Sequence, residues 1–131
     1  MILVDTSVLI DFFQKNENPS VLKFKEIITR EIPFGITSQI YQEILQGTKT
    51  QKDFTHLKSY LETQIFYHPK DSIESYARAA QLYQKCRQQG ITPRSTIDCL
   101  IAQIAIEHKL SLLHHDKDFD RMASVIELKL Y

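Results

Sequence analysis

The chain alternates between short apolar runs and longer segments with helical spacing, and this alternation restricts its fold more than any other feature. The short runs are rich in aliphatic and aromatic residues and end at polar or turn residues, which is typical of buried strands. The longer segments repeat apolar residues every three or four positions, which predicts helices with one buried face. Alternating strands and helices favour a parallel sheet covered by helices on both faces. We therefore expect an α/β fold with a central, mainly parallel sheet.

About five short strands are expected, with the first in the middle of the sheet. They lie at residues 2–6, 33–36, 64–68, 111–115 and 126–130. The expected helices run up to Phe13, from Pro19 toward Pro33, and over 37–47, 51–62, 71–89, 95–108 and 118–123. Thr6 or Ser7 can cap the first helix, because a hydroxyl oxygen accepts hydrogen bonds from the free amides at a helix start.

Length, charge and glycine content limit the classes of function. The 131 residues predict one domain, residues 1–131. Sixteen Lys and Arg balance sixteen Asp and Glu, which argues against unspecific attraction to phosphate as the main function. A local basic rim around an acidic pocket remains compatible with a nucleic-acid substrate. The only glycines are Gly35, Gly47 and Gly90, which stand too far apart for a glycine-rich phosphate loop.

The sequence gives no sign of a membrane segment or of secretion. No run reaches 18 apolar residues, and no basic segment precedes the short apolar start. Cys86 and Cys99 are lone cysteines without the spacing of metal ligands. We therefore expect a cytoplasmic protein with two reduced, buried thiols.

Acidic residues follow two of the predicted strands and begin one predicted helix. Asp5 ends the first strand, Asp116 follows the fourth, and Asp98 lies in the first turn of the most apolar helix. Residues just beyond the carboxyl ends of parallel strands line the ligand crevice, so these acids are expected to converge. A fourth acid, Glu43, lies at the border of an apolar helical stripe.

Each acid also has a purely structural interpretation. Asp5 can cap a helix, although the two hydroxyl residues after it would serve as well. Asp98 can form a capping box with Ser95. Glu43 can be a solvated residue beside a buried face, and Asp116 or one of the two acids after it can cap a short helix.

Taken together, the acids predict a metal-dependent nuclease. Several carboxylates in one crevice repel one another and raise one another's pKa, and a bound divalent cation offsets this cost. Ligands that offer only oxygen suit Mg²⁺ or Mn²⁺. Such sites polarise a phosphoryl oxygen and generate a hydroxide nucleophile for phosphodiester cleavage.

Other functions compete with this interpretation. His114 and His115 adjoin Asp116 and suggest a zinc site, although neighbouring residues on a strand point to opposite faces. A serine hydrolase would need a G-x-S-x-G elbow, which is absent. A phosphoaspartate receiver needs a lysine at the end of its last strand, where Lys129 is poorly placed. A non-catalytic binding module is the last alternative, and the presence of all four acids argues against it.

Three stretches of the chain resemble the PIN-domain family: MILVDTSVLIDFF, SQIYQEILQG and STIDCLIAQIAIEHKLSLLHHDKDFDRMA. They occur in the family's order, and together with the length they look like a VapC-type toxin ribonuclease of a toxin–antitoxin module. The resemblance implies a PIN-like three-layer α/β/α sandwich. It also implies metal-dependent endoribonuclease activity.

The resemblance assigns roles by position. Four acids match the family residues that hold Mg²⁺ or Mn²⁺ and activate water: Asp5, Glu43, Asp98 and Asp116. Ser7 matches a small polar residue that supports the first acid, and Asp118 matches a variable neighbouring acid. His114 and His115 stand where relatives commonly carry small polar residues, which leaves the role of His115 open.

The resemblance also implies partners. It predicts a homodimer, an RNA substrate such as tRNA or rRNA, and a VapB-like antitoxin whose tail fills or disturbs the active site. The candidate side chains for RNA or antitoxin contacts are Arg94, Lys49, Lys52, Lys85 and Arg87. The alternative within the family is an RNA-processing nuclease without an antitoxin.

Overall fold

The computed structural model describes all of residues 1–131. Five strands form one sheet in the order β3-β2-β1-β4-β5, and every neighbouring pair is parallel. The strands are β1 (Ile2–Val4), β2 (Phe34–Ile36), β3 (Ile65–Phe66), β4 (Ser111–Leu113) and β5 (Lys129–Leu130). The predictions of a parallel sheet and of a central first strand are confirmed.

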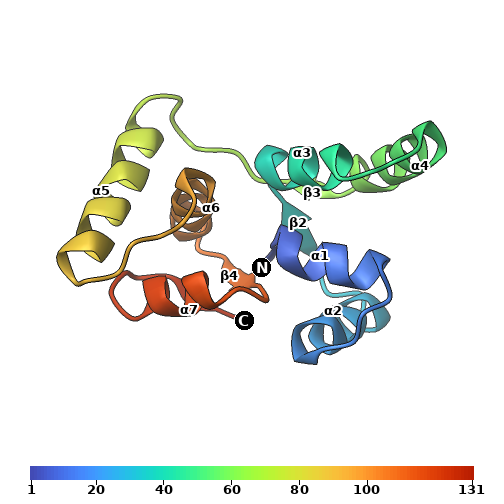
Figure 1. Ribbon diagram of the computed structural model, residues 1–131, viewed down its shortest axis with the longest axis horizontal. Helices are drawn as coiled ribbons and strands as arrows, with labels where there is room; N and C mark the ends of the chain where they lie inside the picture. Colours follow the sequence, from blue (N-terminus) through green and yellow to red (C-terminus); the bar gives the residue numbers. More distant parts are fainter.

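Seven helices alternate with these strands. They are α1 (Thr6–Phe13), α2 (Pro19–Thr29), α3 (Ser38–Gln46), α4 (Gln51–Leu61), α5 (Glu74–Gln88), α6 (Thr96–Glu107) and α7 (Lys117–Ala123). In Figure 1, α5 and α6 pack side by side on the left of the view, and α1 to α4 gather on the right. Helices on both faces of the sheet give the predicted three-layer α/β/α fold.

The core is densest around β1 and α6. Leu3 and Val4 of β1 and Ile101 and Ile104 of α6 are fully buried. Burying one such aliphatic side chain stabilises the folded state by roughly 1.5–3 kcal/mol. Because the core fixes these two elements, the acids at the end of β1 and the start of α6 have well-defined positions.

The first strand ends earlier than the sequence predicts. Residues 2–6 were expected to be extended, but β1 stops at Val4. The reason is that Asp5, rather than Thr6 or Ser7, caps α1, since its side chain accepts a hydrogen bond from the backbone N–H of Ser7. Capping by Thr6 or Ser7 is therefore wrong, and the other interpretation of the sequence, capping by Asp5, is confirmed.

The other strands are also shorter than predicted. The segments 64–68 and 126–130 contribute only two residues each, because β3 and β5 are edge strands that pair on one side. The segment 111–115 ends at Leu113, where the chain turns toward α7.

Most helix starts agree with the sequence pattern. Pro19 opens α2, Thr37 caps α3 and Ser95 caps α6. Helix α5 begins at Glu74, three residues later than expected. Asp71 still receives hydrogen bonds from backbone amides at that helix start, including the one of Glu74.

Both cysteines are buried and free, as expected. Burial raises the pKa of the Cys99 thiol to about 11, so this thiol is protonated and unreactive at neutral pH. No helix has the length and apolar character needed to cross a membrane.

Candidate active site

Two adjacent parallel strands deliver predicted acids to the same edge of the sheet. Strands β1 and β4 pair in register up to Val4 and Leu113. The ladder extends one step further, because Asp5 N donates to Leu113 O at 2.9 Å. Beyond β4 the chain reaches Asp116, which caps α7 and accepts a hydrogen bond from Asp118 N. Asp5 and Asp116 therefore leave the sheet from neighbouring strands.

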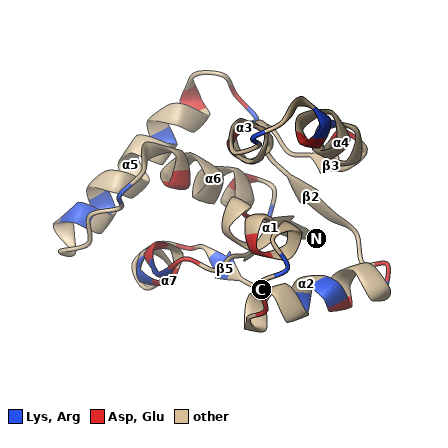
Figure 2. Cartoon of the chain, turned by 45° about the vertical axis from the view of Figure 1, so that its right-hand side comes forward, with Lys and Arg blue, Asp and Glu red and all other residues tan.

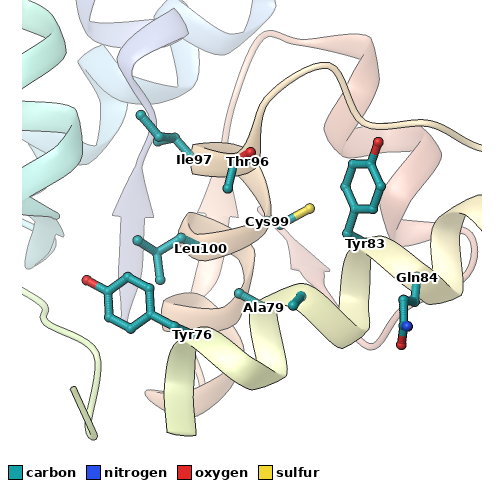
Figure 3. A pocket seen from close by; sticks show the side chains of 9 residues that line it. Tyr76, Ala79, Tyr83, Gln84, Thr96, Ile97, Cys99 and Leu100 are labelled. Carbon is teal, nitrogen blue, oxygen red and sulfur yellow. The ribbon is translucent and has the colours of Figure 1, made fainter. Parts of the chain in front are cut away.

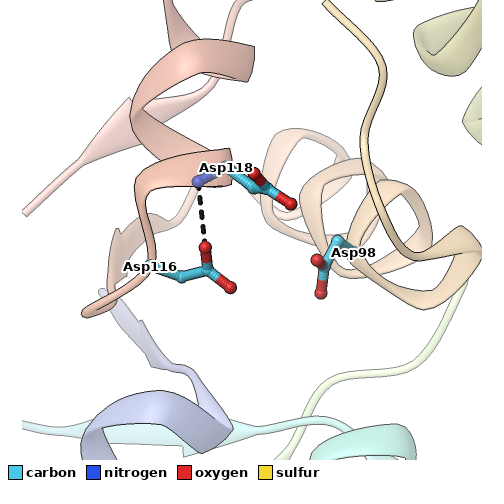
Figure 4. Close-up of side chains that lie close together, drawn as sticks. All are labelled: Asp98, Asp116 and Asp118. Atoms are coloured by element: carbon cyan, nitrogen blue, oxygen red, sulfur yellow. Dashed lines mark hydrogen bonds between the residues drawn. The ribbon is translucent and has the colours of Figure 1, made fainter.

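Three carboxylates form a compact group beyond this edge. Asp98 in the first turn of α6, Asp116, and Asp118 in α7 each offer an oxygen within 4.8 Å of the other two. Figure 4 shows Asp98 facing Asp116 and Asp118 at the start of α7. Asp98 and Asp116 were predicted site residues, whereas Asp118 was expected only as a variable neighbour.

Asp5 is buried beside this group and is held by Ser7. Its Oδ2 atom accepts hydrogen bonds from the hydroxyl of Ser7 at 2.6 Å and from its backbone N–H at 3.1 Å. The same hydroxyl oxygen accepts a hydrogen bond from His115 N at 2.9 Å. Ser7 therefore joins the first acid to the chain that follows β4, as the resemblance predicts.

Glu43 approaches from α3 and is half-buried. Thr6 donates a hydrogen bond from Oγ1 to Glu43 Oε1 at 3.3 Å. Burial and then the negative charge of Asp5 raise the pKa of Glu43. Glu43 and Asp5 lie outside the 4.8 Å group, but both are close enough to act on it electrostatically.

The Asp98 carboxyl group has the most perturbed ionisation in the cluster. Burial raises the pKa of Asp98 to about 7, with added repulsion from Asp5, Asp116, Glu43 and Asp118 in that order. Asp98 forms no ion pair of its own, because α6 carries no Lys or Arg and is mostly uncharged in Figure 2, and the nearby Arg94 pairs with Asp116 and Asp118 instead. Burial likewise raises the pKa of Asp5.

The structure does not support a capping box at the start of α6. Ser95 Oγ accepts a hydrogen bond from Ile97 N, which is the expected cap contact. The reciprocal bond from Ser95 N to the Asp98 carboxylate is absent. Asp98 thus faces the other acids without a hydrogen-bond partner of its own.

Neither histidine belongs to the acid group, and only the His114 side chain contacts the backbone beside it. His114 Nδ1 accepts a hydrogen bond from Asp116 N at 3.0 Å, and its Nε2 lies 3.3 Å from Asp120 Oδ1. The His115 side chain is exposed. The acid group contains no histidine, so the arrangement does not favour the zinc alternative.

Comparison with known proteins assigns the chain to a family. Residues 2–125 match the PIN domain, which is nearly the full chain. The chain belongs to the PIN-domain family. This PIN domain is 31% identical over 130 residues to VapC ribonuclease Mb1587 of Mycobacterium bovis and to ribonuclease VapC11 of Mycobacterium tuberculosis. Each alignment covers 98% of this chain and 96% of the relative, so the resemblance to VapC proteins is confirmed.

Solved structures share the fold of this PIN domain. VapBC2 of Rickettsia felis, bound to a DNA fragment from its promoter, superposes with a TM-score of 0.76 at 20% identity, covering 100% of this chain and 98% of the other. DNA-bound VapBC of Salmonella typhimurium gives a TM-score of 0.75 at 16% identity, covering 99% and 96%. These likenesses confirm the predicted fold.

The donor set of this PIN domain fits a hard divalent cation. Asp5 and Asp116 each use one carboxylate oxygen for hydrogen bonds within the protein, Oδ2 and Oδ1 respectively, and keep the other free of them. Both oxygens of Asp98 are free of such bonds. A group of carboxylates with free oxygen atoms, and without Cys or His, matches the ligand preference of Mg²⁺ or Mn²⁺.

An apolar cavity elsewhere in the PIN domain is separate from this chemistry. It measures about 550 Å³ between α5 and α6, and side chains such as Tyr76, Tyr83, Ile97 and Leu100 line it (Figure 3). None of its lining residues is acidic. The cavity therefore offers no carboxylate ligand for a metal ion.

The raised pKa of Asp98 predicts how stability depends on pH. In the metal-free protein, folded Asp98 keeps its proton up to about pH 7, whereas an unfolded Asp loses it near pH 3.9. The unfolded state thus binds fewer protons in between, so the free energy of unfolding falls as pH rises through this window. We expect a loss on the order of 1–2 kcal/mol between pH 5 and 7 after solvent relaxation.

Melting curves in EDTA from pH 5 to 8 measure this effect. Asp5 and Glu43, whose pKa values are also raised, change stability in the same direction as Asp98, whereas Asp118 and Glu107, whose pKa values are lowered, act at more acidic pH. The melting temperature should fall with pH in the parent and change less in Asp98→Asn. A melting temperature that rises between pH 5 and 7 in both proteins would contradict the assigned ionisation.

Proposed function

We propose that residues 1–131 form a single nuclease domain that cleaves RNA phosphodiester bonds with the help of Mg²⁺ or Mn²⁺. The observation that carries the proposal is the convergence of Asp5, Glu43, Asp98 and Asp116 at one edge of a parallel sheet, where Asp98 forms no ion pair of its own. Without a metal ion, the mutual repulsion of these carboxylates destabilises the folded protein, and a bound divalent ion would offset this repulsion. The ribonuclease names of the relatives support RNA as the substrate.

The chain's own residues prepare the site for hydrolysis. Asp5, Asp98 and Asp116 would hold the cation, with Glu43 completing the ring of negative charge. A divalent ion supplies polarisation of a phosphoryl oxygen and activation of water. Ser7 fixes the Asp5 carboxylate and Thr6 orients Glu43, so the acids require little reorganisation when substrate binds.

We further propose that the protein is the toxin of a toxin–antitoxin pair and is neutralised by a VapB-like antitoxin. Proteins that share its fold include a toxin–antitoxin complex from Klebsiella pneumoniae and VapBC-1 from nontypeable Haemophilus influenzae. The proposal extends to a homodimer and to tRNA or rRNA as the substrate, both on the basis of the family resemblance. An acidic pocket would also attract a basic side chain of the antitoxin.

Growth of a bacterial host tests this proposal. Expression of the chain alone should arrest growth, and Asp5→Ala or Asp98→Ala should relieve the arrest at equal protein level. Glu127→Gln is the matched control, because Glu127 is exposed and forms no contact with the acids. Co-expression of the neighbouring antitoxin-like reading frame should restore growth. If both alanine variants stay as toxic as the parent, the acids are not catalytic.

A further inference from the structure

One arginine bridges two acids of the candidate site. Arg94 lies in the segment between α5 and α6, close to the start of α6. It donates from Nε to Asp118 Oδ2 at 2.8 Å and from Nη2 to Asp116 Oδ1 at 3.3 Å. Its backbone N–H also points at Asp118 Oδ2, at 3.4 Å. Both the side chain and the main chain of Arg94 are therefore held by the same carboxylate.

Asp118 differs from the other acids of the cluster because two arginines pair with it. Its side chain is only 5% exposed, and Arg121 Nη1 lies 3.6 Å from its Oδ1 while Arg94 occupies its Oδ2. The hydrogen bond from Arg94 is the main cause that lowers the pKa of Asp118. Asp98 shows the opposite behaviour, with a raised pKa and no ion pair of its own. The two acids thus serve different purposes although they lie in one group.

The outer end of Arg94 remains open to solvent. The side chain is 75% exposed, and its hydrogen bonds use Nε and Nη2 and leave Nη1 without one. The guanidinium is consequently fixed at its inner edge, while donors at its outer edge stay free. A planar fork held in this way suits two parallel hydrogen bonds to a phosphate.

We propose that Arg94 binds a phosphate of the RNA substrate at the rim of the acidic pocket, and that Asp118 is a positioning residue for Arg94 rather than a metal ligand. The inference rests on the proposed nuclease function. An anionic RNA backbone must approach a ring of carboxylates in a chain of zero net charge. A positive group fixed beside those carboxylates lowers the electrostatic barrier to that approach.

RNA binding without cleavage tests the role of Arg94. Labelled bulk bacterial tRNA is titrated in a Ca²⁺ buffer, after a check that the RNA stays intact. Arg94→Ala should weaken binding by about ten- to hundredfold, the usual range for a charge-assisted hydrogen bond. The slope of log affinity against log salt should fall by about 0.7–0.9, as expected for one lost phosphate contact.

Two further variants separate charge from local structure. Arg94→Lys keeps the charge but loses the fork, so it should keep the salt slope and recover part of the affinity. Arg78→Ala is the matched control, because Arg78 is an exposed arginine that pairs with Glu74, far from the acids in the sequence and outside their contacts. This control should bind tRNA like the parent.

Metal binding provides a second readout. If Arg94 and Asp118 only stabilised the fold, their substitution would not weaken tRNA binding while leaving Mn²⁺ binding intact. Added MnCl₂ should raise the melting temperature of Arg94→Ala at least as much as that of the parent, because Arg94 no longer competes for Asp116. Asp118→Asn should keep most of this Mn²⁺ shift but bind tRNA more weakly, because Arg94 loses its support.

The outcomes distinguish this inference from the proposed function. If the parent cleaves and binds RNA and Arg94→Ala binds with equal affinity and salt slope, the role of Arg94 is overturned and the nuclease function stands. If Asp118→Asn abolishes the Mn²⁺ shift, Asp118 is a ligand and its positioning role is wrong. If the parent neither binds tRNA nor cleaves total RNA, the proposed function falls and the inference falls with it.

Discussion

Asp98→Asn is expected to lower the rate of RNA cleavage by about 10³-fold while it raises the melting temperature of the metal-free protein. The amide keeps the size of the side chain but removes a negative oxygen from the proposed cation site. Divalent ions contribute several kcal/mol of transition-state stabilisation, and each 1.4 kcal/mol corresponds to a tenfold change in rate. Loss of one central ligand therefore predicts a decrease of this size.

The gain in stability has the same electrostatic origin. Asp98 is repelled by four acids and forms no ion pair of its own. Two carboxylates about 5 Å apart repel by roughly 3 kcal/mol at an effective dielectric near 20, before relaxation and protonation reduce the value. Removing one charge should therefore stabilise the metal-free protein by on the order of 1 kcal/mol, which raises the melting temperature by a few degrees.

Melting curves with EDTA and with excess Mg²⁺ complete this test. The parent should gain stability from Mg²⁺ by linkage, and Asp98→Asn should gain much less. Glu127→Gln serves as the control and should behave like the parent in cleavage and melting. If Asp98→Asn is less stable than the parent without metal and still shows the full Mg²⁺ shift, Asp98 acts only at the helix end.

The architecture was predictable from the sequence because the apolar pattern of each segment and the order of strands and helices both indicate a parallel sheet. Apolar alternation required a parallel sheet, and the run before Asp5 is too apolar to lie at an edge. The parallel order then predicted that Asp5 and Asp116 meet, since neighbouring strands end at one side of the sheet. Asp98 followed from its place at the start of a helix that is buried nearly all round.

Several features depend on distant contacts and were not predictable from local patterns. Asp5 caps α1 and also joins the acid cluster, so its two interpretations were never exclusive. The bond between Arg94 and Asp118 joins residues 24 positions apart. Its only sequence signal was an unexplained extra acid after the fourth strand.

The packing around Gly35 also could not be predicted from local sequence patterns. A Cβ atom at Gly35 in β2 would lie 2.4 Å from Tyr67 Cε2 and 2.8 Å from the carbonyl oxygen of Ile65. Glycine is required at this position because an aromatic ring and the neighbouring strand occupy the space that a side chain would need. In the sequence, Gly35 served only as one of three isolated glycines that argue against a phosphate-binding loop.

Metal removal has the other large expected effect, since Asp5, Glu43, Asp98 and Asp116 are all proposed to act through bound metal. RNA cleavage should disappear in EDTA and return with excess Mg²⁺ or Mn²⁺. Ca²⁺ should bind the same carboxylates but support little turnover, because its looser coordination positions the attacking water poorly. The melting temperature should rise with each of these ions in the parent.

Cleavage of total RNA by the purified protein, before and after exhaustive EDTA treatment, tests most directly whether the acids work by holding a divalent cation. An Asp98→Asn preparation purified in parallel measures any contaminating ribonuclease. We expect cleavage by the parent to fall to the level of that preparation in EDTA and to recover with Mn²⁺. Cleavage by the parent that persists in EDTA at its original rate, while the Asp98→Asn preparation stays inactive, would contradict a metal-dependent mechanism.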